Sequence, residues 1–179
     1  MALTSARAPE LLKPASIVFI LLTLAGALLL NLLPWQGLAL SFRPDFVALV
    51  LVFWAIHEPR KQGIGLPWVV GLLMDIGDGA ILGQHAFAYV LAVYAAIVLH
   101  RRIQRFALWQ QVSHVLVLLL LAQAAMLLIR LFGGAVSPGL GYFLACFTGA
   151  ALWPPLSLLL LLPQRGRAGS DSVYSAGHK

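Results

Sequence analysis

The sequence predicts an all-α membrane protein, and three observations support this fold class. Hydrophobic residues make up 61% of the 179 residues and charged residues only 10%, which leaves too few polar side chains to cover a water-soluble globule. Several apolar runs approach the length of about 20 residues that crosses a bilayer core as a helix. These runs lack the period-two alternation of a membrane β-barrel, so helices, which pair their own backbone groups, are the expected elements.

Six segments are predicted to cross the membrane, each an apolar run bounded by proline, glycine or charged residues. The second run, closed by Pro59, is short and only just crosses the hydrocarbon core. The third carries Asp75, Asp78 and three glycines, so we expect its second half to be broken. The sixth is expected to be kinked at Pro154 and Pro155. The six spans are residues 15–33, 44–57, 66–81, 85–99, 112–132 and 140–162.

The distribution of lysine and arginine predicts the orientation of these spans. With a cytoplasmic N-terminus, ten of the 12 basic residues lie in cytoplasmic segments, and only Arg43 and Arg130 lie outside, in agreement with the positive-inside rule. A count of five spans would place the basic cluster at 101–105 outside. Both chain ends are therefore predicted to be cytoplasmic, with a single six-helix membrane domain over residues 1–163 and a disordered cytoplasmic tail over residues 164–179.

The sequence argues against several classes of function. Topology accounts for the net charge of +6, so nucleic-acid binding, which needs basic residues gathered on one face with interleaved aromatics, is not expected. There is no H-E-x-x-H, G-x-S-x-G or P-loop motif, and no doubled aspartate cluster that would hold Mg²⁺. Asp75, Asp78 and His85 do not complete a metal-ligand set. We therefore expect neither enzymatic activity nor a cofactor.

The candidate functional residues are polar groups predicted on the outer side. A carboxylate at the centre of a bilayer costs about 2.5–3.5 kcal/mol, so Asp75 and Asp78 need a partner, water or a proton. Arg43, Asp45 and Arg130 fall toward the same side of the predicted topology. In one interpretation, the two aspartates pair with Arg130 or Arg43 and hold the second, third and fifth spans around an outward-facing cavity. In the other, Asp78 is a hydrated loop residue and only Asp75 is buried.

Two further features concern packing and lipid. Gly71 and Gly83 are candidates for close helix packing, because small residues let helix backbones approach each other within a membrane. Residues 100–110 interleave basic and apolar side chains next to a helix end. This segment is a stop signal that sets the topology, or it lies in the headgroup layer and binds anionic lipid, or it contacts a cytoplasmic partner.

Short motifs give the chain a resemblance to a known family. The motifs are Arg-Pro-Asp at residues 43–45, Gly-Leu-Leu-Met-Asp at residues 71–75, and the stretch from Asp78 to Ala86. In these, in its length and in its charged ends, the chain resembles MreD, the small rod shape-determining membrane protein, over most of the chain up to about Leu162. The resemblance transfers no residue role, so the polar residues named above are candidates on physical grounds.

The resemblance implies an inner-membrane, multi-pass subunit of the lateral cell-wall elongation machinery, which carries out peptidoglycan biosynthesis and maintains rod shape. It implies binding to the single-span scaffold MreC, and work alongside MreB filaments and the peptidoglycan polymerase/transpeptidase pair. It further implies a six-helix arrangement similar to the substrate-binding components of energy-coupling vitamin transporters. An interaction subunit packed against MreC is favoured. The alternative is a small-molecule or lipid-binding component, a vitamin-uptake subunit or a carrier, that uses the outward cavity.

The predicted topology is tested by reporter fusions. Alkaline phosphatase fused at residue 104 or at the C-terminal end should be inactive, because both points are expected on the cytoplasmic side, and a fluorescent protein fused there should mature. An active phosphatase at residue 104 would contradict the even number of spans.

Overall fold

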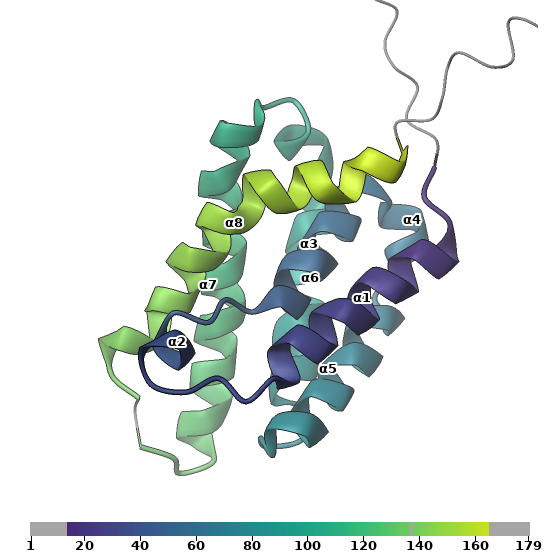
Figure 1. Ribbon diagram of the computed structural model, residues 1–179. Helices are drawn as coiled ribbons and strands as arrows, with labels where there is room; N and C mark the ends of the chain where they lie inside the picture. Colours follow the sequence, from purple (N-terminus) through teal and green to yellow (C-terminus); the bar gives the residue numbers. More distant parts are fainter. Residues whose placement is uncertain (1–13, 137, 165–179) are drawn as a thin grey trace, which may run out of the picture.

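The computed structural model describes residues 14–136 and 138–164, and within these residues it contains helices and no strand (Figure 1). The all-α prediction is thus confirmed for the described part. Short connecting elements are α2 (Leu38–Ser41), α4 (Pro59–Gln62) and the 3-10 turns η1 (Leu140–Phe143) and η2 (Leu162–Gln164). The longer helices, each overlapping one predicted span, are α1 (Ile17–Leu32), α3 (Phe46–His57), α5 (Gly65–Asp78), α6 (Gln84–Ile103), α7 (Leu108–Phe132) and α8 (Leu144–Leu161).

Three helical regions in the described part are long and apolar enough to cross a membrane, namely Gln84–Ile103, Leu108–Phe132 and Gly141–Gln164. The helices α1 and α3 are apolar but shorter. The lengths and composition of the helices therefore agree with a membrane protein, whereas the count of six crossings and the orientation of the chain stay predictions.

The helix α3 lies at the centre of the bundle. All of its residues from Val47 to Ile56 are buried, as expected for a helix that is apolar all round, and it contacts α1, α6, α7 and α8 (Figure 1). With 12 residues it is much shorter than α7, which has 25. At about 1.5 Å per residue the difference is roughly 20 Å. The neighbouring helices thus extend beyond the centre and enclose a space that no helix fills.

The helix α5 is continuous from Gly65 to Asp78 and ends at Gly79, so the break predicted in the second half of the span 66–81 lies after both aspartates. The helix ends because Gly79 adopts a left-handed conformation with φ of 63°, and its N–H donates to the carbonyls of Asp75 and Ile76. Glycine suits this position because it adopts positive φ without the strain of a Cβ. Both aspartates therefore lie in the last turn of an intact helix.

The two glycines predicted to pack have different roles. A Cβ at Gly71 would overlap the backbone of Ala86, so the absence of a side chain lets α5 approach α6 closely, as predicted. A Cβ at Gly83 would meet nothing within 4 Å, but this residue has φ of +96°. The packing role predicted for Gly83 is therefore wrong, and the residue instead forms the turn that starts α6.

The last helix and the tail also bear on the predictions. Pro154 and Pro155 lie inside α8, and Figure 1 shows the helix axis changing direction along its length, in agreement with the predicted kink. Gln164, the first residue of the predicted disordered tail, lies in η2 and is buried, so the prediction is wrong for this residue. The rest of the predicted tail, residues 165–179, lies outside the described residues, as do residues 1–13.

The close approach of α5 and α6 predicts opposite effects of one substitution at two glycines. Gly71→Ala should lower the free energy of unfolding by about 1–3 kcal/mol, because an overpacked contact forces backbone shifts. Gly26→Ala, on the exposed side of α1 with nothing within 4 Å of its Cβ, should be neutral or stabilising by up to about 1 kcal/mol. Denaturant unfolding in detergent micelles measures both, and equal stability of the two variants would contradict the close approach.

Candidate functional site

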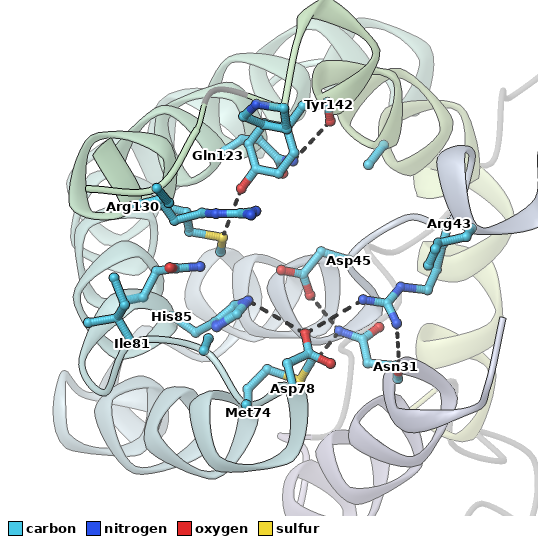
Figure 2. A pocket seen from close by; sticks show the side chains of 18 of the residues that line it. Asn31, Arg43, Asp45, Met74, Asp78, Ile81, His85, Gln123, Arg130 and Tyr142 are labelled. Carbon is cyan, nitrogen blue, oxygen red and sulfur yellow. Dashed lines mark hydrogen bonds and ion pairs between the residues drawn. The ribbon is translucent and has the colours of Figure 1, made fainter. Parts of the chain in front are cut away.

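A cavity of about 790 Å³ lies at the N-terminal end of α3 (Figure 2). This volume is in the range of roughly 300–1,000 Å³ that is typical of small-molecule sites. Each of the six long helices, or a turn next to it, contributes to the wall. The polar and charged lining residues are Asn31, Arg43, Asp45, Asp78, Gln84, His85, Gln123, Arg130 and Tyr142. The structure thus gathers four of the five charged residues predicted from the sequence, Arg43, Asp45, Asp78 and Arg130, around one space.

Asp75 lies behind this wall, with its side chain fully buried. Its Oδ2 accepts a hydrogen bond from the backbone N–H of Gly83 at 2.8 Å, and its Oδ1 accepts one from the backbone N–H of His85 at 2.8 Å. The Nδ1 atom of His85 also lies 2.8 Å from Oδ1. The first N–H groups of a helix have no partner within the helix. Asp75 therefore caps α6 from the neighbouring helix.

The pairing of Asp75 with Arg130 or Arg43 is thus wrong, because backbone N–H groups and an imidazole already satisfy this carboxylate. Asp78 does pair as predicted: its Oδ2 lies 3.7 Å from Nη2 of Arg43, with both side chains partly exposed. The same oxygen lies 3.9 Å from Nε2 of His85. Each interpretation of the sequence is therefore correct in part, since Asp75 is buried and Asp78 is both paired and accessible.

Asp45 joins three helices at the floor of the cavity. Its carboxylate accepts from the backbone N–H of Ala48 at 3.0 Å, which caps α3. It also accepts from Nδ2 of Asn31 in α1 at 2.9 Å and from the hydroxyl of Tyr89 in α6 at 2.8 Å. Asn31 in turn accepts from the backbone N–H of Phe46 at 3.0 Å. The network links α1, α3 and α6 at the end where the cavity lies.

Arg130 lies on the opposite side of the cavity from Asp78 and Arg43 (Figure 2). It extends from α7, and its guanidinium carbon lies 5.8 Å from the centre of the Tyr142 ring, within the range of a cation–π contact. Gln123 donates to the carbonyl of Tyr142 at 3.0 Å and holds this turn against α7. Within the described residues, no carboxylate lies within 4 Å of Arg130.

Sequence reasoning missed Asn31, Tyr89 and Tyr142 as parts of this site. A signal was present for Asn31, because a lone amide in the apolar run of α1 needs a hydrogen-bonding partner in a membrane. Tyr89 and Tyr142 carried no such signal, since tyrosine is common at membrane interfaces. The side chains of the described residues form no group of three or more histidine, cysteine, aspartate or glutamate residues arranged to hold a metal ion.

The apolar helices and the polar cavity at one end of the bundle define a helical integral membrane protein. The protein-family model for the rod shape-determining protein MreD matches residues 14–162. The chain therefore belongs to the MreD family, whose members are shape-determining membrane proteins. The rod shape-determining protein MreD of Haemophilus influenzae is 26% identical over 134 residues, which cover 75% of this chain and 83% of that protein. No solved structure matches the chain, so the likeness to vitamin-transporter components stays a prediction.

The capping role of Asp75 predicts a difference between two substitutions in one helical turn. Asp75→Asn should lower the free energy of unfolding by about 1.5–3 kcal/mol, because hydrogen bonds to a charged acceptor are lost and an amide NH₂ can face backbone donors. Asp78→Asn should lower it by less than about 1 kcal/mol, because its ion pair is long and partly exposed. Denaturant unfolding of both variants in micelles is the measurement, and an equal loss would contradict the cap.

Proposed function

We propose that this chain is a multi-pass protein of the bacterial inner membrane that acts as a non-catalytic interaction subunit of the cell-wall elongation machinery. In this role it binds the single-span scaffold MreC and works beside MreB filaments and the peptidoglycan polymerase/transpeptidase pair. Membership in the rod shape-determining family supports a role in cell-wall elongation. The contacts at the two ends of the bundle and one exposed helix face support the topology and the partner.

The six-span topology is supported by the residues that meet at each end of the bundle. Residues predicted on the outer side, including Arg43, Asp45 and Arg130, line one cavity. Residues predicted on the cytoplasmic side meet elsewhere: Ala15 donates to the Glu58 carboxylate at 2.9 Å and accepts from Lys61 at 2.6 Å. Gln104 donates to the carbonyl of Ile56 at 2.6 Å. Alternating crossings require such a separation of helix ends.

The short central helix is compatible with six crossings. A helix that faces lipid must span the hydrocarbon core to keep its backbone groups paired. The helix α3 is enclosed by other helices, so its backbone ends face protein and the polar cavity instead of lipid. The 12 residues of α3 are therefore enough when the longer neighbours cover the remaining thickness.

The proposal that MreC is the partner is based on the exposed face of α1. Leu22 and Leu29 are exposed on this helix, and between them Ala25 and Gly26 are exposed residues with little or no side chain. A Cβ at Gly26 would meet nothing within 4 Å. In lipid, where apolar contact alone gives no advantage, helices associate at such small residues because their backbones can approach. This notch fits the single transmembrane helix of MreC.

A substitution that fills the notch tests whether MreC binds there. Ala25→Leu should reduce co-purification of MreC and restoration of rod shape in cells that lack their own MreD-family protein, because the larger side chain keeps the partner helix at a distance. Ala151→Leu, at an exposed alanine of α8, makes the same change on another face and should leave both readouts near the wild-type value. Failure of the wild-type chain to retain MreC would contradict the proposal, as would equal behaviour of the two variants.

A second function is favoured by the cavity itself. A space of about 790 Å³ with charged walls suits a small-molecule or lipid-binding component, either a vitamin-uptake subunit or a carrier. Stoichiometric co-purification of a single-span protein supports the interaction subunit. A bound vitamin that co-purifies without such a partner supports the uptake subunit.

A further inference from the structure

The charges around the cavity are divided between two walls. Arg43 and Asp78 on one wall and Asp45 on the adjoining floor are joined through Asn31 and through the Arg43–Asp78 pair. The other wall carries Arg130 above the ring of Tyr142. Figure 2 shows these two groups facing each other across the space. The cavity therefore presents a cation on one side and an acid-rich surface on the other.

Arg130 is suited to bind an anion. Arg130 is partly buried and is one of the residues that line the cavity. Its guanidinium lies near one aromatic ring and, within the described residues, near no carboxylate. A guanidinium presents planar N–H groups that bind phosphate or carboxylate oxygens in pairs. An anionic group bound in the cavity would pair with the guanidinium of Arg130.

On the opposite wall, Asp78 has capacity to accept further hydrogen bonds. Its contacts with Arg43 and His85, at 3.7 and 3.9 Å, are longer than hydrogen bonds, and its side chain is 28% exposed. Asp45 differs, because it already accepts from Ala48, Asn31 and Tyr89. An ionised carboxylate offers about four acceptor positions, so Asp78 is the side chain on this wall that is suited to accept from a ligand ammonium.

We propose that the cavity binds a phosphoethanolamine group, with its phosphate on Arg130 and its ammonium on Asp78. The two arginines and two aspartates that line the cavity have formal charges that cancel, so a group that carries both charges, one toward each wall, preserves this balance. A ligand with an anion alone would bring its charge toward Asp45 and Asp78. This proposal does not depend on the binding of MreC.

The position of the cavity favours a lipid headgroup as the source of this ligand. The cavity lies where α1, α5 and α7 end and where α3, α6 and α8 begin, and the ends of transmembrane helices lie at headgroup depth. Phosphatidylethanolamine and soluble glycerophosphoethanolamine both present a phosphodiester monoanion and a primary ammonium. The experiment below separates these two sources.

Native mass spectrometry of the full chain released from micelles tests the proposal with defined lipids. Phosphatidylethanolamine should bind with one molecule per chain and at least ten-fold more tightly than phosphatidylglycerol, which lacks the ammonium, or phosphatidylcholine, whose quaternary ammonium has no N–H. Arg130→Gln and Asp78→Asn should each weaken this binding at least ten-fold. Arg105→Gln, at an exposed arginine of the predicted cytoplasmic cluster, is the control and should bind as the wild type does.

Two further measurements keep the outcome decisive. Arg130→Lys retains the positive charge without the planar fork and should keep part of the affinity, which serves if Arg130→Gln does not fold. Displacement of the lipid by soluble glycerophosphoethanolamine would show that the headgroup suffices, and retention of the lipid would show that its chains also contribute. Equal affinity of wild type and Arg130→Gln, or phosphatidylglycerol bound as tightly as phosphatidylethanolamine, would overturn the proposal while leaving MreC co-purification unaffected.

Discussion

A carboxylate enclosed in an apolar bundle must be satisfied by the protein itself, and the arrangement around Asp75 follows from this constraint. The first N–H groups of α6 and the imidazole of His85 surround its two oxygens. These contacts of Asp75 therefore hold the last turn of α5 against the first turn of α6. Because Gly71 also lets these two helices approach closely, the pair is held together at two points, and this packing sets the positions of Asp78, His85 and Tyr89.

A second consequence comes from the length of the central helix. The helix α3 begins at Phe46 with Asp45 as its cap, so this central helix does not extend into the cavity. Asp45 accepts from α1 through Asn31 and from α6 through Tyr89. The cavity thus has a polar floor, because the residue that caps the short helix α3 also joins α1 and α6. The walls of the cavity are the ends of the helices that extend beyond α3.

The proposed partner surface and the cavity share one helix. The outer face of α1 carries the notch at Ala25 and Gly26, and the last turn of the same helix carries Asn31, which is bonded to Asp45 at the cavity floor. A shape-determining membrane protein of this size has few polar side chains, and in this chain they are concentrated at the helix ends. The lipid-exposed face is left to apolar and small residues, which is the division that packing within a membrane requires.

The sequence by itself determined the medium, the helical class and the positions of the helices, because hydrophobic run length and the placement of proline, glycine and charge act locally along the chain. It also brought Arg43, Asp45, Asp78 and Arg130 to one end of the bundle through the alternation of predicted spans. Tertiary structure alone decided which of them pair. Asp75 faces backbone N–H groups instead of Arg130 because helix packing orients α5 toward the start of α6, and periodicity within one helix carries no information about the neighbour it meets. For the same reason the contributions of Asn31 and Tyr89, and the set of side chains that line the cavity, emerge only when the helices are assembled.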